Sequence, residues 1–319
     1  MRDARLDLLR VVLILGVVCI HTFCVLDLSA YPHYRTWSLT LNALCHYAVP
    51  LFVMLSGIFL MRKCEEPLPM FYKKRLTRIL VPLIPAALFF VALRIFRDGD
   101  VSVDVLKDLL LGRPYYHLWF AFMLLGVYLY MPFLARLVRE VHNGVLAAIS
   151  VLAIYVSGYV GEGPYQIVPY SAYALLGMII YRRNAQKQSV FEGWCCCVIA
   201  FAVTALNARI VLKTGSLATI GYCAPLIMVG SVALLDFVLN CISPSVGGIT
   251  SSKLAALVFG VYLWHPFFKG IAMAILGRVA TFQIWMVFPV TVIAAFVAIY
   301  LVSCFRIGAV LLGVKWIWH

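Results

Sequence analysis

The chain has 319 residues, of which 64% are hydrophobic and 12% are charged, and its mean hydropathy is +0.98. A soluble domain carries about 25% charged and about 45–50% apolar residues, so the surplus here would cover a soluble protein with one continuous apolar surface. The composition therefore excludes a soluble enzyme, a disordered chain and a nucleic-acid module, and it indicates an integral membrane protein.

Ten apolar runs are candidates to cross a bilayer as helices, which takes roughly 17–25 residues each. We expect a polytopic, all-α transmembrane bundle that forms one domain over residues 1–319, with no fused soluble domain, because no loop is long enough to form one. Residues 97–116, with four Asp residues spaced among Val and Leu, are expected to form an amphipathic helix on the membrane surface. In chain order the ten runs are residues 6–26, 39–61, 79–96, 117–135, 144–160, 166–181, 189–208, 217–238, 254–274 and 281–303.

The net charge of +13 is unevenly distributed between the two sides of the expected bundle. The side that holds the N-terminus carries 17 of the 26 Lys and Arg residues, and the opposite side carries nine. Because Lys and Arg concentrate in cytoplasmic loops, we expect the N- and C-termini to be cytoplasmic. The first run lacks a small-residue cleavage site, so we expect no cleavable signal peptide. Most of the ten cysteines lie inside spans, and we expect them to form neither a disulfide framework nor a metal site.

Ionisable residues inside the apolar runs carry the functional signal, since each costs roughly 2.5–3.5 kcal/mol in a span. Arg10 and His21 in the first run are eleven positions apart, almost three helical turns, so they share one face. His21 would lie about 16 Å deeper than Arg10, near the middle of the hydrocarbon core. Asp7, one turn before Arg10, can pair with it. The alternative is that Arg10 only anchors the interface while His21 hydrogen-bonds a neighbouring helix.

The ninth run contains a second histidine at mid-membrane depth, His265, directly before Pro266. Proline has no backbone N–H to donate, so Pro266 should bend the helix and free a carbonyl near Tyr262. A bent helix with a Tyr and a His at the bend suits a buried polar cavity. The alternative is a structural kink with a satisfied histidine.

Three other features are less specific when each is taken alone. His117 and Trp119 open the fourth run, where they could form a site or only an aromatic belt at the outer interface. Ser56 and Gly57 in the second run allow either close helix approach or a small polar niche. The sequence from Lys73 to Arg78 places four cations at the mouth of the third run, which suits a polyphosphate ligand but could also serve only to orient the chain.

Taken together, these residues resemble the integral-membrane acyltransferase family 3, over about residues 5–268. The motifs are similar in style to those of the branch that O-acetylates surface polysaccharides, including enterobacterial common antigen. The resemblance rests on the Arg-x10-His element of Arg10 and His21, on Ser56-Gly57, on the basic Lys73 to Arg78 segment, on His117-Leu118-Trp119-Phe120, and on Tyr262 with His265-Pro266.

The resemblance implies transfer of an acyl group, usually acetyl, from cytoplasmic acyl-CoA to a hydroxyl of a cell-surface or lipid-linked glycan, in the bacterial cytoplasmic (inner) membrane. Acetyl-CoA would be a co-substrate, and no bound cofactor, metal or nucleic acid is implied. The implied catalytic residues are His21, Arg10, His265 and Tyr262; those that bind acyl-CoA are Arg10, Lys74, Arg75 and Arg78; and those that bind the acceptor are His117, Trp119 and Ser56.

These roles follow a simple physical scheme. Coenzyme A is a phosphate-bearing anion that cannot cross the bilayer, so its site should be cationic and cytoplasmic. Arg10, Arg75 and Arg78 would form such a site. His21 could deprotonate the acceptor hydroxyl or briefly carry the acyl group, and the sequence does not separate the two. Tyr262 and His265 could orient the acceptor or stabilise the oxyanion.

A function from a different class also fits the intramembrane histidines. A secondary transporter or flippase for a glycan or an anion could use His21 and His265 as a proton relay. Such proteins often contain inverted repeats, and no internal repeat is obvious in this chain, which counts against this alternative.

Overall fold

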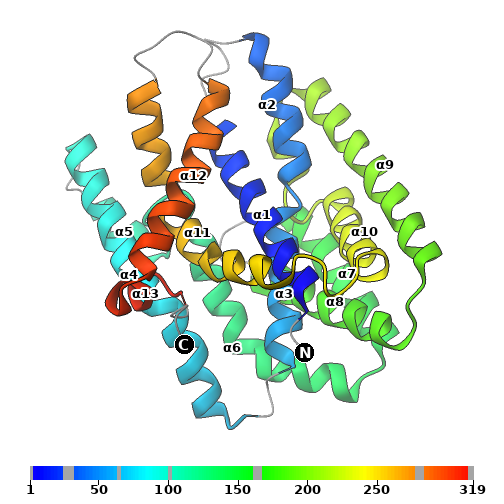
Figure 1. The fold of residues 1–319 in the computed structure, drawn as a ribbon. Helices are drawn as coiled ribbons and strands as arrows, with labels where there is room; N and C mark the ends of the chain where they lie inside the picture. The colour runs from blue at the N-terminus through cyan, green and yellow to red at the C-terminus, as the bar shows by residue number, and fades with distance from the viewer. Residues whose placement is uncertain are drawn as a thin grey trace.

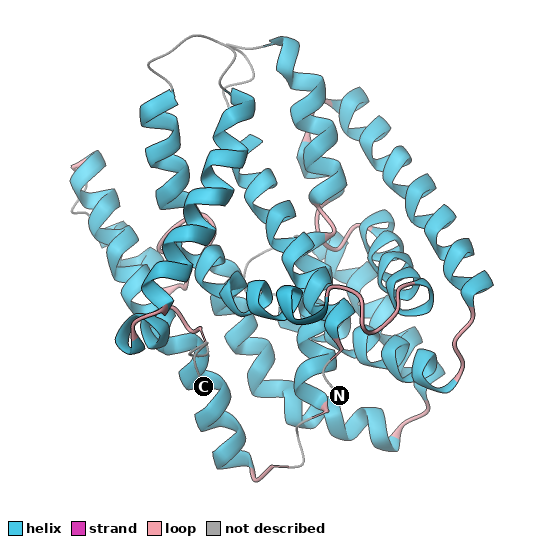
Figure 2. Ribbon diagram, in the orientation of Figure 1, coloured by secondary structure: helices cyan, strands magenta, loops and turns pink. Residues whose placement is uncertain are grey.

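The structure is a computed structural model that describes residues 3–23, 32–62, 66–99, 103–160, 167–276 and 284–314. Of the cations counted for the orientation, Arg2, Lys63, Arg278 and Lys315 lie outside these residues. The described residues form helices and connecting turns, with no strand among them (Figure 2). The all-α fold class is therefore confirmed.

The helices follow one another with short connections (Figure 1). In chain order they are α1 Ala4–Phe23, α2 Pro32–Cys45, α3 Ala48–Met61, α4 Leu68–Asp98, α5 Val103–Leu110, α6 Trp119–Glu140, α7 Asn143–Val160, α8 Ile167–Gln186, α9 Val190–Thr214, the 3-10 helix η1 Leu217–Ile220, α10 Pro225–Cys241, α11 Gly248–Leu276, α12 Ile284–Ser303 and α13 Arg306–Leu311.

Eight helical segments in the described part of the chain are long and apolar enough to cross a membrane. They are α1, the α2–α3 pair over Arg35–Met61, α4, α6, α7, α9, α11 and α12. The remaining two of the ten expected runs correspond to α8 and to η1 with α10, and α10 is a shorter apolar helix of 17 residues. A multi-pass bundle is thus confirmed, whereas ten spans stay a prediction.

Two expected elements differ in detail from the helices observed. The second run was expected to be continuous, but a turn at residues 46–47 divides it into α2 and α3. The surface helix expected over 97–116 is shorter, because α4 continues to Asp98 and α5 covers only Val103–Leu110. The residues after α5 instead form the turns that lead to α6.

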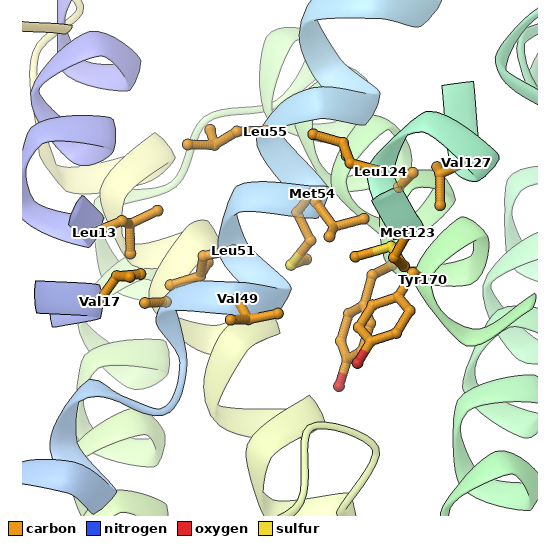
Figure 3. Close-up of a cluster of buried hydrophobic side chains, with 14 of the residues drawn as sticks. Leu13, Val17, Val49, Leu51, Met54, Leu55, Met123, Leu124, Val127 and Tyr170 are labelled. Carbon is orange, nitrogen blue, oxygen red and sulfur yellow. The ribbon is translucent and has the colours of Figure 1, made fainter. Parts of the chain in front are cut away.

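The apolar core centres on α3, which packs against α1, α6 and α8. Gly57 on α3 faces the Ala174 backbone of α8, and Gly177 on α8 faces the Met54 backbone, so the two helices touch without side chains between them. The close helix approach expected from Gly57 is therefore confirmed. Figure 3 shows side chains from all four helices in this core: Leu13, Val17, Val49, Leu51, Met54, Leu55, Met123, Leu124, Val127 and Tyr170.

Helices α1 and α11 run side by side in the same direction. At their N-terminal ends the Ser252 hydroxyl donates to the Asp7 carboxylate at 2.9 Å, and at the other end Lys269 reaches the His21 carbonyl at 3.1 Å. Figure 1 shows that α11 bends part-way along its length, and this helix contains Pro266. The parallel pair brings the bend of α11 to the C-terminal end of α1.

Candidate active site

Three histidines from distant parts of the sequence meet where the end of α1, the bend of α11 and the turn before α6 converge. The rings of His21 and His265 are stacked, with centroids 5.2 Å apart and an interplanar angle of 24°. The ring of His117 approaches both edge-on, with its centroid 6.4 Å from that of His21 and 5.3 Å from that of His265. The structure thus joins into one cluster three residues that the sequence offered separately.

Pro266 determines which nitrogen of His265 carries the proton. Because Pro266 has no N–H, the Tyr262 carbonyl four residues earlier loses its helical donor. His265 Nδ1 lies 2.8 Å from that oxygen and 3.2 Å from the Val261 oxygen, and it must donate, since both partners are carbonyls. The neutral ring therefore keeps its lone pair on Nε2, which is buried and has no hydrogen-bond partner among the described residues. The freed carbonyl expected near Tyr262 is confirmed.

His117 has the opposite tautomer. Its Nε2 lies 3.1 Å from the Leu263 carbonyl and donates to it, which leaves the lone pair on Nδ1. Nδ1 is also buried and without a partner among the described residues. His117 therefore presents an unshared nitrogen lone pair within the cluster.

Tyr262 fixes the turn that carries His117. Its hydroxyl donates to the His117 carbonyl at 2.6 Å and accepts from the Ala121 N–H at 3.2 Å. The His117 carbonyl lies in the turn before α6, and the Ala121 N–H, which also donates to the Leu118 carbonyl at 3.0 Å, lies in the first turn of α6. Tyr262 thus connects the bend of α11 to α6 and sets the position of the His117 ring.

Two residues that sequence reasoning missed complete the cluster. Lys269 Nζ donates to the Tyr116 hydroxyl at 2.9 Å as well as to the His21 carbonyl, although the Lys269 residue is only 6% exposed. The Tyr116 ring lies edge-on to His21, with centroids 5.1 Å apart. Lys269 follows His265 by four residues on a helix, and this spacing was the available signal. In the charge count Lys269 is only one of the nine cations on the side opposite the N-terminus.

The other end of α1 carries Arg10, whose expected pairing with Asp7 is confirmed at 3.7 Å. The Arg10 guanidinium also lies over the Phe59 ring of α3, 5.8 Å from its centroid. Arg10 and His21 are eleven positions apart on α1, about 16 Å along the helix. One helix therefore links a cationic group at its start to the histidine cluster near its end.

Cations from α4 lie at the same end of the molecule as Arg10. Lys74 and Arg75 both pair with Glu66, at 3.3 and 3.7 Å. The Tyr128 hydroxyl on α6 hydrogen-bonds with Ser56 and lies in the electrostatic field of Arg78, Arg10 and Arg75. Because Arg10, Arg75 and Arg78 all neighbour Tyr128, we call these three residues the arginine group.

The three residues expected to bind the acceptor do not lie together. Ser56 neighbours Tyr128 and the arginine group, and Tyr128 is nine residues, about 14 Å, along α6 from Trp119. The Trp119 ring packs against Tyr170 of α8 and Tyr222, with centroids 6.1 and 5.8 Å apart. His117 belongs instead to the histidine cluster.

The comparison with known proteins identifies the family. A family model described as an acyltransferase domain, that of acyltransferase family 3, matches residues 3–305. The chain belongs to this family. The match covers nearly the whole chain, and it confirms the resemblance that the motifs indicated. No curated protein and no solved structure was found to match the chain.

The protein is therefore a multi-pass membrane acyltransferase. Its histidine cluster offers what acyl transfer requires, namely buried neutral imidazole nitrogens that can accept a proton from an attacking hydroxyl. In the part of the chain that the structure describes, no group of three or more His, Cys, Asp or Glu side chains is arranged to hold a metal ion.

Proposed function

We propose that this acyltransferase moves an acetyl group from cytoplasmic acetyl-CoA to a hydroxyl of a cell-surface or lipid-linked glycan, in the bacterial cytoplasmic membrane. The observation that carries the proposal is the placement of the arginine group and the histidine cluster at the two ends of α1. An anionic acyl carrier needs cations for its phosphates and, at some distance from them, a base near its thioester. Helix α1 supplies Arg10 and His21 with that separation.

The donor would bind at the arginine group. Arg10, Arg75 and Arg78 offer planar guanidinium groups, which match phosphate oxygens bidentately, and Lys74 adds a fourth charge. Glu66 partly neutralises Lys74 and Arg75, so a bound phosphate would compete with this carboxylate. The acetyl end of the extended carrier would then lie about 16 Å deeper, beside the histidines.

In the transfer step the acceptor oxygen attacks the thioester carbonyl while an imidazole nitrogen takes the hydroxyl proton. His265 Nε2 and the stacked His21 ring are the groups placed to accept it. The C–S bond then breaks, the acetyl group stays on the acceptor oxygen, and the imidazolium returns the proton to the coenzyme A sulfur. Trp119, two residues after His117, packs against Tyr170 and Tyr222, and a sugar ring would stack on these aromatic side chains.

The test uses membrane vesicles that contain the protein, supplied with acetyl-CoA labelled in the acetyl carbon. Mass spectrometry of the extracted glycans should detect the label, and deletion of the protein should remove the acetyl mass from surface glycans. His21→Ala should lower transfer by about 10²–10⁴-fold. The control His142→Ala changes an exposed histidine in the turn before α7 and should transfer normally. Undiminished transfer by His21→Ala would refute the proposal.

A further inference from the structure

A buried cation lies beside the histidine cluster, and neither the family motifs nor the proposed reaction assigns it a role. Lys269 is 6% exposed, and its ammonium joins two groups from different elements, the His21 carbonyl at 3.1 Å and the Tyr116 hydroxyl at 2.9 Å. It also lies over the Tyr116 ring, 4.9 Å from the centroid. A cation at this depth in a spanning helix is costly and is rarely kept without a function.

The contact with His21 has a specific structural meaning. His21 lies in the last described turn of α1, and Lys269 donates directly to its backbone carbonyl. Helical carbonyls point toward the negative, C-terminal end of the helix dipole, where a cation is favoured. Lys269 therefore supplies both a hydrogen bond and the complementary charge to the turn of α1 that carries the His21 ring.

The second contact ties this turn to the segment before α6. Tyr116 directly precedes His117 in the chain, and its ring touches the His21 ring edge-on, with centroids 5.1 Å apart. Lys269 itself follows His265 by one helical turn on α11. One ammonium group thus joins the three elements that contribute the three histidines.

We propose that Lys269 is a positioning residue, which holds the end of α1 and the Tyr116 turn so that the His21 ring stays stacked on His265. The inference rests on the proposed acetyl transfer, because it concerns the placement of the base. Reacting groups must be held closely, and a displacement of about 1 Å costs about 10²-fold in rate. The arginine group lies about 16 Å away along α1, so donor binding should not depend on Lys269.

Kinetics of labelled acetyl transfer test the proposal, with rates normalised to folded protein. Lys269→Met should lower kcat about 10- to 100-fold and leave the KM for acetyl-CoA within about twofold of the parent value. Lys269→Arg, which keeps a charged donor, should recover a substantial part of the lost kcat. The matched control Lys253→Met removes an exposed cation from the same helix and should match the parent. A parent-like kcat for Lys269→Met, or no recovery with Lys269→Arg, overturns the inference.

A second measurement does not depend on catalysis. Hydrogen exchange of the intact protein in detergent should show faster exchange in the peptide covering residues 14–23 for Lys269→Met but not for Lys253→Met. Unchanged exchange in that peptide also overturns the inference. A parent protein that transfers no acetyl group would refute the proposed function, whereas this exchange result would still decide whether Lys269 holds α1.

Discussion

The lone pair of His265 lies on Nε2 because a proline follows this residue. Pro266 frees the Tyr262 carbonyl, the Nδ1–H group of His265 occupies it at 2.8 Å, and Nε2 is left as the basic atom. The helix bend and the tautomer are thus two effects of one residue. A histidine in an unbent helix would have no such carbonyl to fix its proton.

This assignment predicts different effects for two substitutions at His265. The amide of His265→Asn can still donate to the Tyr262 carbonyl from the Nδ1 position, whereas His265→Gln places its amide near the Nε2 position and leaves that carbonyl unpaired. Both variants lack the base, so acetyl transfer should fall by about 10²–10⁴-fold in each. Thermal unfolding in detergent should show that His265→Asn is the more stable of the two by about 1 kcal/mol. The reverse order would contradict the tautomer assigned.

The sequence could predict some of these residues and not others, for a physical reason. Arg10 with Asp7, and His265 with Pro266, act through neighbours within one helical turn, and local spacing displays such pairs. The association of His117 with His21 and the contact of Lys269 with Tyr116 join separate elements. No spacing along the chain specifies how those elements pack, so the cluster needed the fold.

At the scale of elements, α3 and α8 contact each other through glycine. A Cβ atom at Gly57 would overlap the Ala174 backbone, and one at Gly177 would overlap the Met54 backbone. We predict that Gly57→Ala or Gly177→Ala destabilises the protein by about 1–3 kcal/mol, because backbone atoms cannot move aside as a flexible side chain can. Thermal unfolding in detergent measures the effect. Gly270→Ala on α11 is the control, since open space surrounds it and helix propensity favours alanine there; equal losses at all three glycines would refute the packing argument.

An ion pair between α8 and α10 leads to an asymmetric prediction. Arg183 binds both carboxylate oxygens of Asp236, at 2.8 and 2.9 Å, and the Cys196 thiol donates to the same carboxylate at 3.2 Å. The Arg183 side chain is 56% exposed but that of Asp236 only 4%. Arg183→Met leaves a buried carboxylate without its cation and should lower the free energy of unfolding by about 1–3 kcal/mol. This loss is smaller than for a fully buried ion pair, because water screens the exposed Arg183. Asp236→Asn leaves Arg183 in contact with water and should lower the free energy of unfolding by less than Arg183→Met does.

Thermal unfolding of these two variants, compared at equal detergent and salt, measures the difference. A larger loss for Asp236→Asn than for Arg183→Met would contradict the argument. Arg136→Met provides a further control, because Arg136 pairs with Glu140 on the surface of α6, with the two side chains 69% and 57% exposed. Its removal should change stability little.

For the whole molecule, composition alone established the membrane class, and hydropathy located the apolar helices, because both depend on local averages. The number of spans was harder to predict. The turn at residues 46–47 divides an apolar run that contains no strong helix breaker before Pro50, and α10 is shorter than the run that predicted it. Tertiary contacts decide such boundaries, since non-helical backbone within a membrane protein is tolerated where surrounding protein satisfies its polar groups.

The orientation of the bundle is the remaining whole-molecule prediction, and the proposed function depends on it. Acetyl-CoA can reach the arginine group only if that end of the bundle faces the cytoplasm, as the excess of Lys and Arg on the same side predicts. Helix α9 has 25 residues, about 37 Å, which is enough to cross the hydrocarbon core, and exposed lysines lie at both of its ends. Lys187→Cys and Lys213→Cys therefore place one thiol on each side of the membrane. In intact cells a membrane-impermeant maleimide should label Lys213→Cys above the background of the parent protein, and it should label Lys187→Cys only after permeabilisation. The opposite pattern would place the arginine group outside, where a cytoplasmic acyl donor cannot bind, and would refute both the orientation and the proposed donor.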